Sequence, residues 1–361
     1  MTGSIFEPFL EPTKKEDTTD SIDLTDLSLK DILPPDDQLE LMIKNKQVKS
    51  TIPVQKQIIQ IVLDSIQNNT PINKNQLLKL INNDKSELTA LGNMILRISQ
   101  VGTPLALKLY EQAMILEDDQ GTFSYANMIY RGYRGTTKNE ELGIKLMSEL
   151  ARKGHPYAQM NLGSIIMRQE PDRVQQAIQL YELAGKNGIA QAYLELGRMY
   201  RLGYGVHQDH QKAISYFQKG SQLNHPQCHF MLGVYASSGL GNTSKEPDQT
   251  KAFKYFQKAA MKGLPEAQYN VGLRFLKGHG CEPNMFNAAE FMKMAATQGF
   301  QLAQANLANM YLEGRGLEKD IDQARLWFEK AIEKGGTIGK EAKKQLQSLD
   351  DKKNNSKCIL M

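Results

Sequence analysis

The sequence is poor in features that mark several common classes of protein. No run of about 18 apolar residues occurs, so no transmembrane helix is expected. The first twenty residues contain no arginine and no basic segment followed by an apolar core, so they predict neither a secretory signal nor a mitochondrial presequence. The three cysteines are widely spaced and form no disulfide framework, which favours a reducing compartment.

Motifs for catalysis or metal binding are also missing. No Gly-Lys-Ser/Thr follows any glycine-rich loop, and neither Ser-x-x-Lys nor Gly-x-Ser-x-Gly occurs. His225, Cys228 and His229 lie close together, but a zinc site there needs a fourth ligand. Cys281 has no evident acid–base partner. We therefore predict a chain that is not an enzyme and holds no metal and no cofactor.

Acidic residues are concentrated at the start of the chain. The net charge of +4 includes 11 Asp/Glu and 3 Lys within residues 1–40, a net of −8, so the remainder carries +12. With the helix-breaking pair Pro34-Pro35, this composition predicts an acidic disordered arm over residues 1–49. The stretch SIDLTDLSLKDIL (21–33) fits either a short amphipathic helix on a partner or a solvated tail. The Lys and Arg of the body are dispersed, which favours a solvated surface over a nucleic-acid site.

Internal repetition is what the sequence has in quantity. A first pattern begins at intervals of 34, 36, 39 and 36 residues: AQMNLG (158–163), AYLELG (192–197), CHFMLG (228–233), AQYNVG (267–272) and AQANLA (303–308). A second pattern follows each copy: AIQLYELAGKNG (177–188), AISYFQKGSQLN (213–224), AFKYFQKAAMKG (252–263), AEFMKMAATQG (289–299) and ARLWFEKAIEKG (324–335). A weaker copy of both lies within residues 122–154.

The two patterns predict a helix–loop–helix unit. In the first helix the small residue and the residues four and five positions later share one face. The second helix supplies aromatic pairs such as Tyr216-Phe217 and Trp327-Phe328. Residues that accept a left-handed C-cap stand where each second helix should end: Gly154, Gly188, Asn224, Gly263, Gly299 and Gly335. Stacking such units buries the faces that one unit leaves exposed.

The segments AQYNVG, GYGV and AFKYFQKAAMKG resemble Sel-1-like repeats, relatives of tetratricopeptide repeats with a longer loop between the helices. The resemblance covers about residues 122–335, six units, with a divergent unit at 86–121. It implies an all-α, right-handed α-solenoid of stacked helix–loop–helix repeats. We expect a helical region over 50–121 and a solenoid over 122–349, in which Lys344 replaces a repeat glycine in a polar terminal cap.

The first helices of such a solenoid line its concave face. Positions three and six after the small residue point away from the buried set. They supply the candidate partner-binding residues Asn161, Glu195, Asn270, Asn306, Arg198 and Asn309. Asparagine can pair with the donors and acceptors of an extended peptide. The alternative is that these asparagines bond to the neighbouring repeat.

The last four residues, Cys358 to Met361, fit the C-a-a-X pattern for farnesylation. Residues 350–361 are therefore expected to form a flexible tail that a prenyltransferase modifies on Cys358. One lipid binds membranes reversibly, and nearby lysines would supply a second, electrostatic attraction to an anionic membrane: Lys343, Lys344, Lys352, Lys353 and Lys357. The alternative is an ordinary hydrophilic terminus.

Sel-1-like repeats with a prenylation box resemble the fungal chitin synthase activators, although those proteins have long additional regions that this sequence lacks. The leading hypothesis is a non-catalytic adaptor that binds a protein partner and reaches a cytoplasmic membrane face through its lipid, with a membrane enzyme such as chitin synthase as a possible target. The alternative is a soluble or organellar chaperone-like assembly factor without lipidation. Adaptors of endoplasmic-reticulum degradation share these repeats, but the missing signal and membrane span argue against that class.

Overall fold

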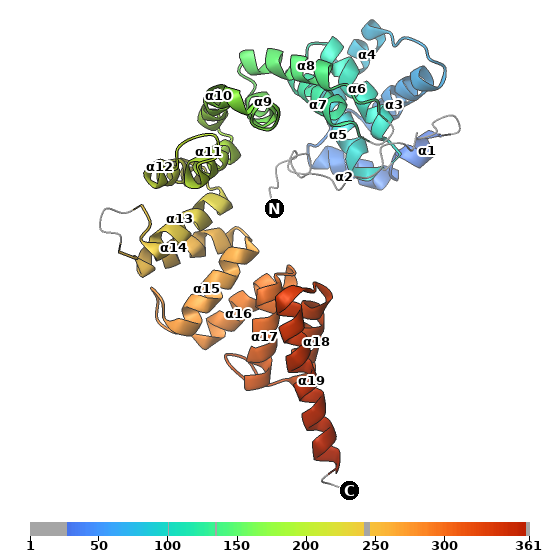
Figure 1. The fold of residues 1–361 in the computed structure, drawn as a ribbon. Helices are drawn as coiled ribbons and strands as arrows, with labels where there is room; N and C mark the ends of the chain where they lie inside the picture. The colour runs from blue at the N-terminus through green and yellow to red at the C-terminus, as the bar shows by residue number, and fades with distance from the viewer. Residues whose placement is uncertain (1–26, 100, 134–135, 242–245, 359–361) are drawn as a thin grey trace. The chain divides into compact units, whose positions relative to one another are not determined.

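The computed structural model describes residues 27–99, 101–133, 136–241 and 246–358, with side chains described up to residue 350. Within these ranges every regular element is a helix, so the predicted all-α fold is confirmed (Figure 1). The chain divides into two compact units, Met1–Ile165 and Ile166–Met361, which are described separately. Among the described residues, no helix has the length and apolar character needed to cross a bilayer.

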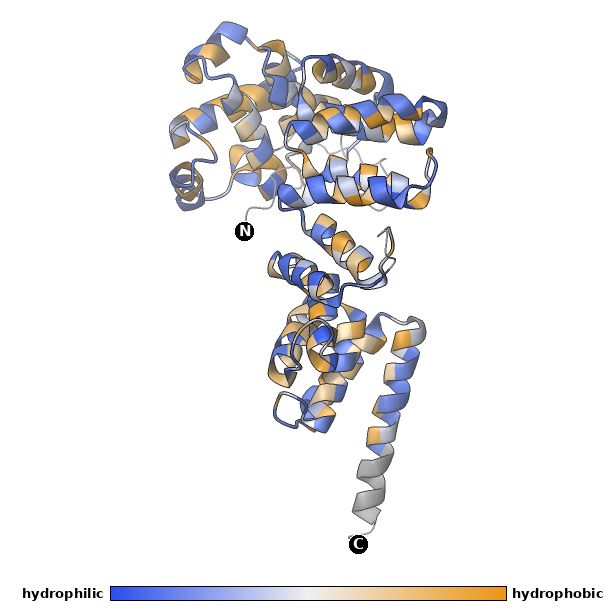
Figure 2. Ribbon diagram, turned by 90° about the vertical axis from the view of Figure 1, so that its left-hand side faces the viewer, coloured by the Kyte–Doolittle hydropathy of each residue, from blue (hydrophilic) through white to orange (hydrophobic). Residues whose placement is uncertain are grey.

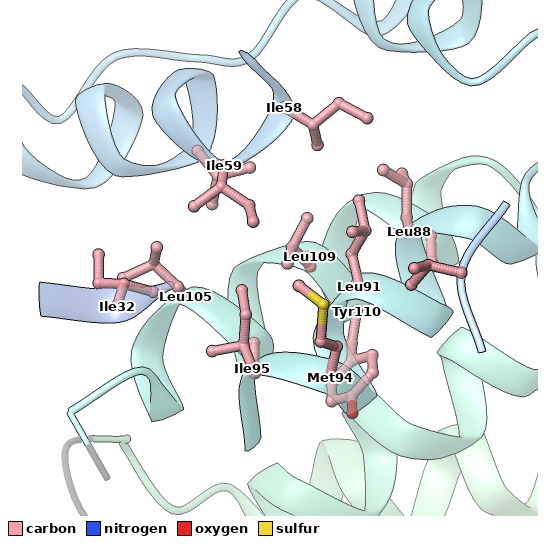
Figure 3. Packing of buried hydrophobic residues seen from close by; sticks show 14 of the residues in the cluster. Ile32, Ile58, Ile59, Leu88, Leu91, Met94, Ile95, Leu105, Leu109 and Tyr110 are labelled. Carbon is pink, nitrogen blue, oxygen red and sulfur yellow. The ribbon is translucent and has the colours of Figure 1, made fainter. Parts of the chain in front are cut away.

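The first unit has a large apolar core. Its helices are α1 (Leu29–Ile32), α2 (Asp36–Lys44), α3 (Ile52–Gln67), α4 (Lys74–Leu80), α5 (Ser86–Ile98), α6 (Thr103–Ile115), α7 (Asp119–Arg131), α8 (Glu140–Arg152) and most of α9 (Pro156–Gln169). Figure 3 shows side chains from α3, α5 and α6 meeting in this core, with Ile59, Leu91 and Leu109 among them. In the α5–α6 pair, where the sequence predicts a divergent repeat, a Cβ on Gly92 would lie 2.6 Å from the Tyr110 ring.

From residue 27 on, the structure differs from the expectation of a disordered arm over residues 1–49, and residues 1–26 lie outside the described ranges. Residues 29–48 contain α1 and α2, and Ile32, Leu39 and Val48 are 2%, 0% and 1% exposed. The carboxylate of the buried Glu87 accepts hydrogen bonds from the backbone N–H groups of Lys49 (3.1 Å) and Ser50 (2.8 Å), which attaches this segment to α5. The described part of the 21–33 stretch therefore packs on the chain's own core. Its residues 21–26 lie outside the described ranges.

The second unit is built from repeated helix pairs. Its elements after α9 are η2 (Pro171–Arg173), α10 (Val174–Lys186), α11 (Ala190–Leu202), α12 (His210–Gln222), α13 (Pro226–Ser238), α14 (Gln249–Met261), α15 (Pro265–Lys277), α16 (Met285–Thr297), α17 (Gln301–Glu313), α18 (Ile321–Glu333) and α19 (Gly336–Cys358). Most are amphipathic, as the alternating colours along each helix in Figure 2 show. Helices α11, α13, α15 and α17 each pack on both of their even-numbered neighbours, and α19 packs on α18, so the helices form a solenoid.

The residues predicted to end the second helices do so in a left-handed conformation. Gly188, Asn224 and Gly263 have φ of 92°, 60° and 89°, and Gly154, Gly299 and Gly335 are also positive. The glycine at the end of the first-helix pattern provides space for the aromatic residue of the second helix. A Cβ on Gly197 would lie 2.3 Å from the ring of Phe217, which is fully buried. The predicted close approach of the two helices is confirmed there.

The last helix packs on the final repeat and then extends beyond it. Ala342 is 1% exposed and belongs to the same core as Trp327 and Phe328 of α18. The backbone remains helical through Cys358, whereas the sequence predicts a flexible tail from residue 350. Since Gly and Pro are missing between residues 340 and 358, nothing in the local sequence stops the helix. The side chain of Cys358 and residues 359–361 lie outside the described part of the chain.

Candidate functional site

The predicted partner-binding residues lie on first helices and are half-buried. Asn161 is on α9 and belongs to the first unit, while the others are on α11, α15 and α17 of the second. Asn306 Nδ2 donates to Tyr269 Oη on α15 (3.1 Å), and Asn161 Nδ2 lies 3.4 Å from Asn127 Oδ1 on α7. Asn270 instead donates to Glu266 O in its own helix (2.7 Å). Two of the four candidate asparagines, Asn161 and Asn306, thus bond to the neighbouring repeat, the alternative that the sequence left open.

Glu195 and Arg198 are brought together in one polar network. Arg198 Nη1 donates to Glu195 Oε1 (3.2 Å), and Gln191 Nε2 donates to the same oxygen (2.6 Å). Gln191 Oε1 lies 3.0 Å from His225 Nε2, which precedes α13. Burial, assisted by the positive charges of Arg198 and His229, lowers the pKa of His225 to about 4. His225 is therefore neutral at pH 7, and the network joins two successive repeats.

A glutamine ladder, which the sequence analysis did not identify, connects the first helices α9, α15 and α17 to the helix before each of them. The amide nitrogens of Gln159, Gln268 and Gln304 donate to the carbonyl oxygens of Ala151, Ala260 and Ala296, each eight residues earlier (3.2 to 3.3 Å). These carbonyls are at helix ends, and each also accepts from the N–H of the glycine three residues later (2.9 to 3.1 Å), so the glutamine adds a second hydrogen bond. The signal was present in the sequence as the Gln of each Ala-Gln pair.

The ladder is interrupted in the α11 and α13 repeats, where Tyr193 and His229 occupy the glutamine position. The Tyr193 ring covers Gly185, on which a Cβ would be only 2.6 Å from it. His229 is 5% exposed, and its Nδ1 has no hydrogen-bond partner among the described residues. Burial together with the charges of Lys258 and Lys262 lowers the pKa of His229. These two repeats are where the second unit departs most from its own pattern.

Neither of the two thiols that the structure describes, Cys228 and Cys281, has the usual activation of a nucleophile. Cys228 is completely buried against Gly220, and burial raises the pKa of its thiol to about 12. Burial also raises the pKa of Cys281, with Arg274 acting in the opposite direction. Among the described residues, no three His, Cys, Asp or Glu side chains converge in a way that would hold a metal ion.

The glycine loops are seated on the preceding repeat. Gly280 and Gly316 have φ of 80° and 73°, and a Cβ on them would lie 2.0 and 1.9 Å from the carbonyl oxygens of Gln249 and Met285. Those residues begin α14 and α16, the second helices one repeat earlier. Close backbone approach thus accounts for these glycines.

One of these loops borders an open pocket of about 610 Å³, lined by Gln175, Tyr200, Gly203, Gly205, Val206, His207, Gln208, Asp209 and Lys212. No strand precedes the loop, and no Gly-Lys-Ser/Thr follows it, so it lacks the elements of a phosphate-binding P-loop.

Comparison with known proteins finds repeats of the same period. A family model described as the Sel1 repeat matches residues 120–155, 156–189, 190–225, 226–264, 265–300 and 301–336. No curated protein matches. Among solved structures, a Sel1 repeat protein from Oxalobacter formigenes is 20% identical, with a TM-score of 0.62, and the alignment covers 94% of this chain and 99% of that one. The protective antigen c5321 of uropathogenic Escherichia coli is 26% identical, with a TM-score of 0.60 over 80% of this chain and 60% of that chain.

Proposed function

Because this chain belongs to the Sel1 repeat family, we propose that it is a non-catalytic scaffold that binds a protein partner on the first-helix face of its repeats. Sel1 repeat proteins are generally protein-interaction scaffolds. The observation that carries the proposal is the six-repeat match in phase, since stacked pairs form an extended surface without needing a catalytic pocket. The half-buried row at Glu195, Arg198, Asn270, Asn306 and Asn309 supplies polar groups to that surface.

The side chains of this row can form hydrogen bonds beyond those that they make within the protein. Each carboxylate oxygen and each amide group can take part in more than one hydrogen bond, and the guanidinium of Arg198 has five donors. One Arg198 donor is used toward Glu195, and Asn306 uses one amide hydrogen toward Tyr269. These internal bonds fix the side chains before a partner arrives, which reduces the entropic cost of binding.

A paired substitution tests the scaffold proposal. The full chain, tagged at its N-terminus, is used to capture partners from eukaryotic cells, alongside the Arg198→Ala/Asn309→Ala variant. The Ser215→Ala/Lys293→Ala variant, changed on exposed positions of second helices, is the matched control. We expect the first variant to lose a partner that the wild type and the control retain, at unchanged thermal stability. Equal capture by all three would contradict the first-helix location.

The proposal includes membrane recruitment by a prenyl group on Cys358. This part applies if Met361 is the last residue of the translated protein. The support is the Cys-Ile-Leu-Met pattern and the lysines that precede it. We further propose that the lipid places the protein on the cytoplasmic face of a membrane. There it would control a membrane enzyme such as chitin synthase.

Intact mass of the chain from a eukaryotic host tests the lipid. We expect loss of residues 359–361 and gain of one prenyl group, both abolished by Cys358→Ser. An unmodified chain ending at Met361 removes the membrane part and leaves the scaffold part standing.

A further inference from the structure

Two adjacent second helices of the second unit differ in charge from their neighbours. The helices α10, α12, α14, α16 and α18 have 13 residues each and align without gaps. Helices α12 and α14 contain two and three lysines and no Asp or Glu, whereas α10, α16 and α18 each contain both signs. The excess of positive charge is therefore a local property of two repeats and not a feature of the repeat pattern.

The lysines and tyrosines of these helices fall on one face. Lys212, Tyr216 and Lys219 on α12 are spaced i, i+4 and i+7, and Lys251, Tyr255 and Lys258 on α14 have the same spacing. Both helices pack on α13. We define the lysine–tyrosine face as these six residues together with the exposed Lys254 and Lys262.

Aromatic rings lie beneath the two lysines of α12. Lys219 Nζ lies 4.8 Å from the centre of the Tyr216 ring and 5.8 Å from that of Tyr193, and Lys212 Nζ lies 5.2 Å from that of Tyr200. The rings of Tyr200 and Tyr216 stack at 5.6 Å, and Tyr216 Oη donates to Glu182 Oε1 at 2.6 Å. Such contacts restrict the lysine stems and leave the ammonium groups facing solvent.

The charges of the face are almost uncompensated within the described residues. Only Lys212 has a carboxylate within 4 Å, that of Asp209 at 3.9 Å. The exposed ammonium groups of Lys219, Lys251, Lys254, Lys258 and Lys262 have none. The effect of Lys258 and Lys262 on the buried imidazole of His229 agrees with a positive field on this side of α13.

The position of Lys219 over the Tyr216 ring argues against single-stranded nucleic acid as the ligand. Single-stranded nucleic acid binds basic surfaces by stacking bases on free aromatic faces. Tyr216 is only 9% exposed and lies beneath Lys219, so its ring offers no such platform. What remains accessible is a set of exposed ammonium groups, of which those of Lys212 and Lys219 lie over rings, and the complement of such a set is a chain of carboxylates.

We propose that the lysine–tyrosine face binds an acidic segment of a partner protein. The proposal rests on the scaffold function and adds to it a second surface, on second helices, with a stated chemistry. The neighbouring helices limit the surface, because the position of Lys219 and Lys258 is taken by Leu183 on α10 and Met294 on α16. A segment that binds here therefore spans two repeats.

The test uses the full chain and a fluorescein-labelled octaglutamate peptide, followed by fluorescence anisotropy at low and high salt. We expect Lys219→Glu/Lys258→Glu to weaken binding by about tenfold or more, because it replaces two attractions by two repulsions, and Lys219→Gln/Lys258→Gln to weaken it less, because it only removes the attractions. The matched control is Lys186→Glu/Lys293→Glu, which has the same charge change on α10 and α16 and is expected to lose less than about twofold.

Equal weakening in the two charge-reversed variants would overturn the proposal, because the peptide would then respond to net charge alone. Tighter binding of the wild type to an oligouridine RNA or to phosphatidylserine vesicles than to octaglutamate would also overturn it. Partner capture by the Arg198→Ala/Asn309→Ala variant tests binding at the first-helix face independently of the lysine–tyrosine face. Failure of the peptide to bind would thus remove this surface without removing the scaffold function.

Discussion

Gly316→Ala is expected to destabilise the second unit strongly, because the residue combines a left-handed backbone with a close backbone contact. Its φ is 73°, and a Cβ would stand 1.9 Å from the carbonyl oxygen of Met285 and 2.3 Å from the carbonyl carbon. The left-handed conformation costs an L-residue roughly 1–2 kcal/mol. The overlap cannot be relieved by a side-chain rotation, so the loop must leave α16. We expect a total loss of about 3 kcal/mol or more.

Gly335→Ala is the matched control for that substitution. Gly335 has φ of 65°, and an added Cβ would meet nothing within 4 Å. It is expected to lose only the conformational cost of about 1–2 kcal/mol. The effect of Gly→Ala on the unfolded chain is common to both variants and cancels in their difference. That difference measures the seating of the loop on the preceding repeat.

Urea denaturation followed by tryptophan fluorescence measures both variants. Trp327 is the only tryptophan of the chain and lies in the core of α18, between the two altered glycines in sequence. Hydrogen exchange of residues 314–320 then reports whether the loop has separated from α16. If Gly316→Ala and Gly335→Ala destabilise the unit equally, within about 0.5 kcal/mol, the contact with Met285 has no energetic role and the reasoning fails.

Three further predictions concern the second unit. Because burial lowers the pKa of His225 from 6.5 to about 4, the unfolded chain binds more protons between these values, so stability falls by up to ~3 kcal/mol as pH drops through that window. In urea titrations His225→Asn should lessen this pH dependence, and an unchanged pH profile would contradict the assignment. Phe217→Ala removes a fully buried ring and is expected to cost about 3–5 kcal/mol in thermal unfolding, whereas a loss below ~1 kcal/mol would show that the α11–α12 interface is loose. Gln268→Ala removes one of two hydrogen bonds to the Ala260 carbonyl, which still accepts from the Gly263 N–H (2.9 Å), and should cost about 0.5–1.5 kcal/mol; a neutral result would remove the ladder's role.

The repeat unit was predictable because its signals are local. A left-handed turn needs Gly or Asn at one position, so Gly188 and Asn224 mark helix ends in the sequence itself. Gly197 likewise predicts a close contact between two helices, because the first-helix pattern ends in a small residue and the second-helix pattern contains an aromatic residue. The nearly constant spacing of the copies along the sequence then predicts that the helix pairs stack on one another.

The remaining features depend on contacts between distant residues. The acidic composition of residues 1–40 and the Pro34-Pro35 pair favoured disorder for the segment 29–48, although its share of apolar residues is ordinary. Ile32 and Leu39 are buried because α3 and its neighbours cover them. Whether Asn306 faces a ligand or a neighbour depends on Tyr269, 37 residues earlier. The uncompensated lysines of α14 appear only once the positions of the carboxylates are known. Such features require the structure, since no spacing in the sequence encodes them.

The seating of each glycine loop on the previous repeat gives the array a direction. The loop containing Gly280 is seated on α14, and the loop containing Gly316 is seated on α16, so each of these seats precedes its loop in the chain. A chain emerging from the ribosome makes each seat before the loop that uses it, so repeats are completed in the order of synthesis. Shortening the array from its C-terminal end leaves every remaining loop supported, whereas shortening it from the other end leaves the first loop without a support.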